Sequence, residues 1–252
     1  MNVLVTGGGT SAPIDDVRTI TNVSTGRFAA AISESCLARQ ANVWHVHTPS
    51  AALPVFRQAK LDLEAADVTG ELDRLHRLHE RWKRVRDRLH LVALPEGTVD
   101  QYARTLEYLL RTQPIDVAFL AMAVSDYEPA PTLGKLSSDE DELLIRCRRT
   151  PKVIRSVRDW SPEVYLVGFK LLSRTTAEEL VRQAEASGRI NRADLTVAND
   201  LQSLAAGKHT VHLVRTGHPP LMLPPGLDLA DRLVEQVFAW VGCSSRFATD
   251  RL

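Results

Sequence analysis

The feature that most constrains the fold is a repeated alternation of short apolar runs with helix-compatible sequence. The first run, NVLVT at 2–6, ends in a glycine turn, and NVWHVH at 42–47 follows a segment compatible with a helix from about Ser24 to Gln40. Three further runs are expected to form strands, at 116–121, 164–169 and 194–199. Since strands that alternate with helices build parallel sheets covered on both faces, the sequence predicts an α/β fold with a Rossmann-like, doubly wound, mostly parallel sheet.

Length and charge narrow the class of protein further. The 252 residues are 44% hydrophobic and 25% charged, which is ordinary for a globular chain with a substantial core. Lys plus Arg total 31, as do Asp plus Glu, so the chain lacks the positive field that nonspecific nucleic-acid binding needs. No apolar run approaches the ~20 residues of a membrane span, and no basic segment of a secretory signal follows Met1. We therefore expect a cytoplasmic protein whose partners are small molecules, with no nucleic acid and no membrane.

Cysteine and histidine spacing gives no metal site. The three cysteines, Cys36, Cys147 and Cys243, are far apart and lack CxxC spacing, which predicts reduced structural thiols. His45 and His47 alternate on one predicted strand, but no carboxylate or cysteine cluster accompanies them, so core histidines are expected there. Metal ligands are therefore left unassigned.

One region between the second and third predicted strands does not fit a minimal Rossmann pattern. Leu, Trp and Val recur at three- and four-residue spacing over 71–89, which predicts an amphipathic helix with a solvated basic outer face. We interpret it as part of a helical insertion at about 53–90.

A second region is a predicted flap at about 128–150. The polar run from Glu128 to Glu142 precedes the alternating sequence LLIRCR at 143–148, which predicts a β segment. With a last amphipathic helix over 227–241, we expect the whole chain, 1–252, to form a single domain.

A glycine-rich turn, TGGGTSAP, follows the first predicted strand. Glycines there let backbone N–H groups approach phosphate oxygens closely, and Gly7, Gly9 and Ala12 also match the GxGxxA fingerprint of dinucleotide-binding folds. Pro13 stands where that fingerprint needs a helix to open, and no acidic residue closes the second strand to hold a ribose. A Rossmann-type dinucleotide-binding oxidoreductase is therefore an alternative function that these departures disfavour.

The segment TNVSTGR, which follows shortly after, is a candidate anion site. If a helix begins near Ser24, its free N–H groups and partial positive charge attract a phosphate. Ser24 or Thr25 can cap such a helix, Gly26 permits close approach, and the amide of Asn22 suits a carbonyl or a developing oxyanion. An ordinary capped helix start is the alternative interpretation.

The run GGTSAPIDDVRTITNVSTGR resembles the signature of the phosphopantothenate–cysteine ligase family, also called phosphopantothenoylcysteine synthetase. Further matches follow in the family's order: AMAVSDY (121–127), GKLSS (134–138), RTPKVI (149–154), DWSPEVYLVGFKL (159–171) and ADLTVANDL (193–201). Together they run through about four-fifths of the chain, whereas residues 53–90 fall outside the resemblance to the bacterial form. Because no flavin-binding decarboxylase domain precedes Met1, the chain is most similar to the monofunctional form.

The resemblance implies a two-step ligation in coenzyme A biosynthesis. A nucleoside triphosphate with Mg²⁺ activates the carboxylate of 4′-phosphopantothenate as an acyl-nucleotide, and the amine of cysteine then displaces the nucleotide. A carboxylate has no leaving group until its oxygen carries a phosphoryl ester, so charge handling is the main catalytic task.

The resemblance also assigns nucleotide contacts. Gly8, Ser24 and Gly26 resemble the family's triphosphate contacts, while Phe169 and Asn199 resemble its base and ribose contacts. The AND run at 198–200 is similar to the CTP-using bacterial form, and GKLSS occurs in eukaryotic-type members that use ATP. The resemblance therefore favours CTP as the co-substrate, with ATP possible.

Substrate-binding and catalytic roles follow in the same way. Asn22, Ala123 and Asp126 match positions near phosphopantothenate, with Asn22 placed to hold the activated acyl group. Lys135 matches the flap lysine that serves turnover of the acyl-nucleotide, and Arg18 matches a residue supplied across a dimer interface, which implies a homodimer. The family's KIKK flap is reduced here to one lysine, so a non-catalytic nucleotide-binding relative is a further alternative.

Overall fold

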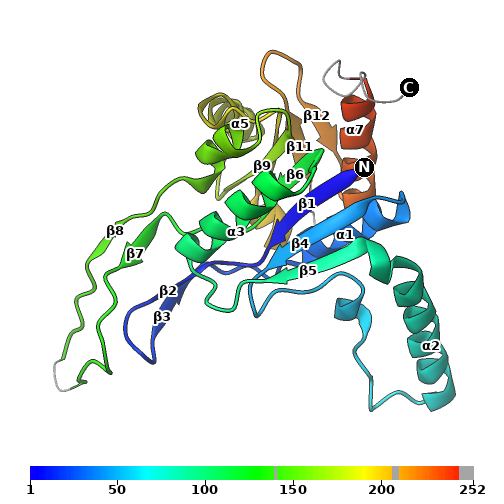
Figure 1. Cartoon of the computed structure of the whole chain (residues 1–252), viewed down its shortest axis with the longest axis horizontal. Helices are drawn as coiled ribbons and strands as arrows, with labels where there is room; N and C mark the ends of the chain where they lie inside the picture. Colours follow the sequence, from blue (N-terminus) through cyan, green and yellow to red (C-terminus); the bar gives the residue numbers. More distant parts are fainter. Residues whose placement is uncertain (139–140, 206–209, 244–252) are drawn as a thin grey trace.

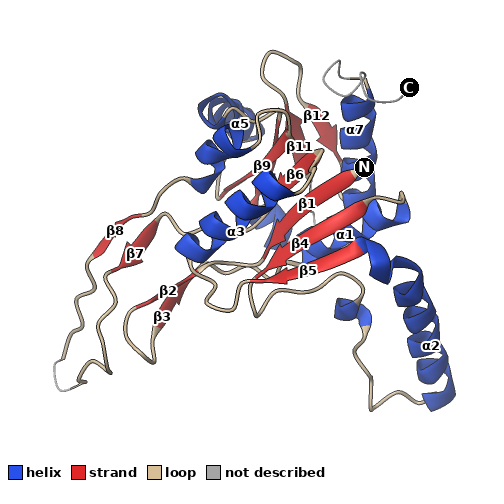
Figure 2. Ribbon diagram, in the orientation of Figure 1, coloured by secondary structure: helices blue, strands red, loops and turns tan. Residues whose placement is uncertain are grey.

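An eight-stranded sheet forms the centre of the protein (Figures 1 and 2). The computed structural model describes residues 1–138, 141–205 and 210–243. The sheet has the order β12-β11-β10-β9-β6-β1-β4-β5. Its strands are β1 (Asn2–Gly7), β4 (Asn42–His47), β5 (Leu89–Ala93), β6 (Val117–Leu120), β9 (Tyr165–Leu172), β10 (Leu195–Asp200), β11 (Val211–Val214) and β12 (Leu221–Leu223).

The helices connect the strands and cover the sheet. They are α1 (Arg27–Ala38), α2 (Val68–Val85), α3 (Val99–Thr112), α4 (Val157–Trp160), α5 (Ala177–Asn191), α6 (Leu201–Ala205) and α7 (Leu229–Gly242), with 3-10 turns η1 (Phe56–Gln58), η2 (Arg86–Arg88) and η3 (Val153–Ser156). None of the helices within the described ranges combines the length and apolarity needed to cross a bilayer.

The topology confirms the predicted fold class. Six strands are parallel, and only β11 and β12 pair antiparallel at one edge. Taken in chain order, the parallel strands have the Rossmann order 3-2-1-4-5-6, which reverses between β1 and β6. In open sheets of this kind ligands bind beside the carboxyl ends of the strands at that reversal point.

Alternate side chains of the strands build two cores on opposite faces of the sheet. Val3 and Val5 pack on the face covered by α1 and α7, together with Ile32 of α1. Leu4 points the other way, into a core with Leu106 of α3. Because both faces are covered, the central strands are apolar on both sides, as the continuous runs in the sequence predicted.

The helix predicted over 71–89 begins earlier and ends sooner than expected. It is α2, Val68–Val85, and after one 3-10 turn the chain enters β5 at Leu89. Leu89 fits the apolar stripe of the helix and also opens the strand LHLVA, so spacing alone could not separate the two elements. The segment interpreted as an insertion therefore lies in the connection between β4 and β5, and α2 projects beyond the sheet in Figure 1.

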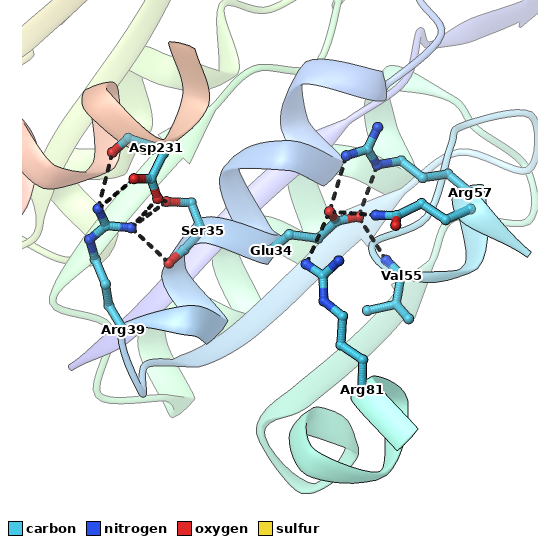
Figure 3. Close-up of polar contacts among 8 residues, drawn as sticks. Glu34, Ser35, Arg39, Val55, Arg57, Arg81 and Asp231 are labelled. Carbon is cyan, nitrogen blue, oxygen red and sulfur yellow. Dashed lines mark hydrogen bonds and ion pairs between the residues drawn. The ribbon is translucent and has the colours of Figure 1, made fainter. Parts of the chain in front are cut away.

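A buried carboxylate fastens this connection to α1. Glu34 accepts hydrogen bonds from the backbone N–H of Val55 (2.9 Å), from Nε of Arg57 (2.9 Å) and from Arg81 of α2 (3.4 Å), as Figure 3 shows. Burial alone would raise the pKa of Glu34, but the bonds from Arg57 and Val55 outweigh it and lower the pKa. An ionised Glu34 thus anchors the loop and the helix at once.

Two antiparallel arms extend beyond the carboxyl edge of the sheet (Figure 1). One is the hairpin of β2 (Ser11–Pro13) and β3 (Thr19–Thr21), and the other pairs β7 (Tyr127–Pro129) with β8 (Cys147–Arg149). The second arm carries the predicted flap. The β segment expected at 143–148 is shorter and lies further along the chain, because β8 begins only at Cys147 and ends at Arg149.

The burial of His45 predicts how the stability of the fold depends on pH. Its side chain is fully buried, with Nδ1 2.8 Å from Oγ of Ser33, and burial, followed by the nearby His47, lowers its pKa to about 3. Below pH 6.5 the unfolded chain binds a proton that the folded chain does not, so stability falls as pH drops from 6.5 towards 3. The slope from this group is at most about 1.4 kcal/mol per pH unit.

We therefore expect urea unfolding at pH 7, 6 and 5 to show a smaller loss of stability in His45→Gln than in the wild type. His218→Gln, at an exposed histidine, is the control and keeps the wild-type slope. Equal slopes in all three proteins would contradict a neutral buried His45.

Candidate functional site

The glycine turn lies at the point where the strand order reverses. Gly8 has φ of 97°, a left-handed conformation that favours glycine, and its carbonyl accepts a hydrogen bond from the N–H of Ala123 (2.9 Å). The carbonyl of Ala123 in turn accepts from the N–H of Thr10 (3.0 Å). The ends of β1 and β6 are thereby joined, and the predicted residues Gly8 and Ala123 are neighbours.

Asn22 is held beside the same turn by its backbone. Its N–H donates to the carbonyl of Thr10 (3.2 Å), and a Cβ added at Gly9 would lie 2.0 Å from the Asn22 carbonyl oxygen. No side chain other than hydrogen fits at Gly9 without moving Asn22. Asn22 is half-buried, and its side-chain amide forms no hydrogen bond with the described residues. This polar group is therefore available to a ligand at the turn.

The N-terminus of α1 completes this side of the site. Gly26 is the N-cap, with φ of 67°, and a Cβ added there would lie 3.2 Å from the backbone nitrogen of Gly8. The helix begins at Arg27, later than predicted, and its N-cap is the left-handed Gly26 rather than Ser24 or Thr25. Oγ1 of Thr25 nevertheless accepts a hydrogen bond from the N–H of Arg27 (3.5 Å). The positive end of the α1 dipole points towards this turn, which favours an anion there.

A cleft of about 360 Å³ opens on the α3 and α5 face of the sheet, beside the ends of β6 and β9. Met122 and Ile154 supply apolar surface, and Asp126 and Gln183 add polar groups. Phe169 borders the cleft from β9, but its ring packs on the other face of the sheet, against the core below α1. Concave sites lined by apolar side chains and a few polar groups are typical of sites for small organic ligands. Of the predicted residues, this cleft brings Asp126 and Phe169 together.

Phe169 also connects the cleft with the N-terminus of α1. Its ring packs edge-on against that of Phe28, with centroids 6.3 Å apart and planes at 82°. Asn199 lies on the neighbouring strand β10, two positions beyond the partner of Phe169 in the register. The predicted base and ribose contacts therefore lie on adjacent strands, next to the predicted phosphate site.

Asp126 is engaged at the base of the flap. Its exposed carboxylate forms an ion pair with Lys152, and its backbone carbonyl accepts a hydrogen bond from Thr150 N–H (3.1 Å). Lys152 belongs to the RTPKVI run, to which no role was assigned from the sequence, although Pro151 and Ile154 of the same run line the cleft. The match of the RTPKVI run to the family pattern was the sequence signal that could have indicated these residues.

Arg18 and Lys135 form a separate group on the arms. The guanidinium of Arg18 lies 3.2 Å from the carboxylate of Asp15, and its Nη2 lies 3.4 Å from the carbonyl of Leu136 on the flap. Lys135 is exposed and forms no ion pair with the residues that the structure describes. Within one chain, the structure does not bring Lys135 against Asn22.

Thr48, which follows β4, contacts the glycine turn, and the sequence analysis assigned it no role. It is 2% exposed, its Oγ1 has no hydrogen-bond partner among the described residues, and a Cβ added at Gly8 would lie 2.1 Å from that oxygen. The side chain of Thr48 thus leaves room only for glycine at position 8.

Across the described ranges, no group of three His, Cys, Asp or Glu side chains is placed to hold a metal ion.

Comparison with known proteins identifies the family. The sequence model of the DNA/pantothenate metabolism flavoprotein C-terminal domain matches residues 1–86 and 98–240. The chain belongs to this family. The matched range includes 53–86, most of the region that the sequence analysis placed outside the resemblance to the bacterial form.

Curated relatives match most of this chain. The coenzyme A biosynthesis bifunctional protein CoaBC of Thermococcus kodakarensis is 29% identical over 236 residues, which cover 93% of this chain and 50% of that protein. The phosphopantothenate–cysteine ligase of Mus musculus is 27% identical over 80% of this chain and 73% of its own length. The chain spans half the length of the bifunctional relative.

A crystal structure of the DNA/pantothenate metabolism flavoprotein from Streptococcus pneumoniae superposes with a TM-score of 0.75. It is 27% identical, and the match covers 95% of this chain and 99% of the other. The family's fold is therefore shared over nearly the whole chain, arms and sheet together.

Proposed function

We propose that this protein is a phosphopantothenate–cysteine ligase that acts in coenzyme A biosynthesis through an acyl-nucleotide. The observation that carries the proposal is the convergence of Gly8, Gly26 and Asn22 at the reversal point of the sheet, with the ring of Phe169 packed on Phe28 of α1 nearby. This arrangement offers an anion site, a polar amide and an apolar surface within one edge of the fold. The mouse relative, which aligns over 73% of its length, supports the monofunctional form.

In the first half-reaction a carboxylate oxygen of 4′-phosphopantothenate would attack the α-phosphorus of the nucleotide, and pyrophosphate would leave. The glycine turn at Gly8 and the α1 N-terminus would bind the phosphates, because the helix dipole favours negative charge there. Ser24 lies two residues before Gly26 and could donate its hydroxyl to the same phosphates. Ala123 and Asp126 would border the pantothenate side, and the amide of Asn22 would donate to the acyl oxygen.

In the second half-reaction the cysteine amine would attack the acyl carbon, an amide bond would form, and the nucleoside monophosphate would leave with the bonding electrons. Charge on the leaving phosphoryl group increases in this step. We assign its stabilisation to Lys135 of the flap, whose ammonium group is not neutralised by an ion pair with the described residues.

The nucleotide is proposed to be CTP, with its base against Phe169 and its ribose near Asn199. Mg²⁺ would supply charge neutralisation on the triphosphate, and it is typically bound by substrate phosphates and only one or two carboxylates. The scarcity of clustered ligands among the described residues fits a metal that arrives with the nucleotide.

We propose the cytoplasm as the location, because thiols such as the substrate cysteine are kept reduced there.

A homodimer is a further part of the proposal. It is supported by the resemblance of Arg18 to a residue supplied across an interface and by the two arms, whose short strands leave backbone groups open for pairing. Analytical sedimentation of the active protein should give twice the mass of the 252-residue chain, and an active monomer would contradict it.

The deciding experiment is mass spectrometry of a mixture of the protein, 4′-phosphopantothenate, cysteine, Mg²⁺ and each nucleoside triphosphate in turn. The proposal predicts an amide of the two substrates, with one pyrophosphate released per amide. Omission of 4′-phosphopantothenate is the control and should abolish pyrophosphate release. Nucleotide binding without any product would favour the non-catalytic relative.

A further inference from the structure

The acidic pair Asp15–Asp16 contacts the flap rather than the glycine turn. Asp15 is 4% exposed, and its Oδ1 accepts hydrogen bonds from the N–H groups of Val17 (2.9 Å) and Arg18 (2.7 Å), which closes the turn between β2 and β3. Its Oδ2 accepts from the N–H of Leu136 (3.1 Å) and from Nη1 of Arg18 (3.2 Å). One carboxylate therefore serves the turn and the flap together.

Asp16 forms hydrogen bonds with the same segment of the flap, at Gly134. Its N–H donates to the carbonyl of Gly134 (3.1 Å), and its Oδ2 accepts from the N–H of Gly134 (3.1 Å). A third bond runs from the N–H of Thr132 to the carbonyl of Ile14 (2.9 Å). Lys135 consequently stands between Gly134 and Leu136, each of which is held by a carboxylate.

Charge makes these contacts stronger than ordinary hydrogen bonds. Burial would raise the pKa of Asp15, but the N–H groups of Val17, Leu136 and Arg18, with the charge of Arg18, outweigh burial and lower the pKa. An ionised acceptor forms shorter and stronger bonds to N–H donors than a neutral one does. The exposed side chain of Lys135 has no comparable tether among the described residues, so its position depends on the backbone on either side.

We propose that Asp15 and Asp16 are positioning residues that latch the flap to the β2–β3 turn and present Lys135 for the second half-reaction. The inference rests on the function proposed above, and it assigns neither carboxylate a contact with substrate. Arg18 shares Asp15 with Leu136, so the residue assigned to substrate binding and the flap that carries Lys135 are joined through one side chain.

The latch is tested first without any substrate, by hydrogen exchange of the backbone amides in the full chain. Asp16→Ala removes a carboxylate that is exposed and takes no part in closing the turn, so the fold should persist. We expect exchange at Gly134 and Leu136 to rise roughly 10-fold, as for loss of one charge-assisted bond. Asp100→Ala, an exposed aspartate paired with Arg104 on α3, is the matched control and should leave flap exchange unchanged. Unaltered flap exchange in Asp16→Ala overturns the latch.

The second test is a double-mutant cycle with Lys135→Gln. Asp16→Ala alone should slow the second half-reaction roughly 10-fold and leave pyrophosphate release in the first unchanged. In the Lys135→Gln background the same change should have no further effect, because the residue that the latch positions is gone. Additive losses would overturn the proposal. If the wild type lacks ligase activity, the proposed function fails, and the exchange experiment still decides the latch.

Discussion

Replacing Lys135 by Gln is expected to slow the second half-reaction by roughly 30- to 1,000-fold while the first continues. The estimate corresponds to ~2 to 4 kcal/mol for one charge-assisted contact in a closed site. The physical reason is that the ammonium group offsets charge on the leaving phosphoryl group, and glutamine can donate a hydrogen bond but carries no charge. Quenched-flow with radiolabelled CTP should show one pyrophosphate per site and an acyl-nucleotide that accumulates.

Lys83→Gln is the control for this change. Lys83 is an exposed lysine of α2 that pairs with Glu80, and its replacement should leave both half-reactions at wild-type rates. Equal losses of both half-reactions in Lys135→Gln would show that the lysine binds nucleotide and has no specific part in turnover.

The central strands were predictable because they are buried on both faces. β1 and β4 coincide with the predicted runs to within one residue, since uninterrupted apolar sequence followed by a turn has few other structures. β5 was missed because Leu89 continues the apolar stripe of α2 into the strand, so the periodicity changes without a breaker. The start of α1 was placed too early because serine and threonine are good caps, whereas the N-cap is the left-handed Gly26, where a Cβ would lie 3.2 Å from the backbone nitrogen of Gly8.

The sequence nominates the residues of the candidate site but not the contacts between them. The motif order indicated Gly8, Asn22 and Ala123, yet their proximity depends on backbone bonds through Thr10, a residue of the same motif to which the sequence analysis assigned no contact. The same limit applies to Asp15, since a carboxylate in a turn-forming run is typical of a local turn, and its second bond reaches Leu136, 121 residues away. Long-range hydrogen bonds of this kind follow from the topology and not from local spacing.

Replacing Asn22 by Asp is expected to block the first half-reaction, the opposite pattern from Lys135→Gln. The change keeps the shape of the side chain and removes its donor, and it places a negative charge beside the carboxylate that must approach the nucleotide. The half-buried setting at the turn reduces screening of that repulsion. We expect pyrophosphate release to fall by about 100-fold or more, with no acyl-nucleotide detected, from loss of the donor and repulsion together.

Asn22→Ala separates the two effects, because it removes the amide without adding charge. Its first half-reaction should lie between the wild type and Asn22→Asp, and the difference between the two variants measures repulsion alone. Nucleotide binding to the phosphate site should persist in both variants, since the backbone bond from Asn22 to Thr10 that shapes the turn does not involve the side chain. Wild-type pyrophosphate release in Asn22→Asp would mean that this residue only shapes the turn around Gly9, and the acyl group would then have to be held by another donor at the reversal point of the sheet.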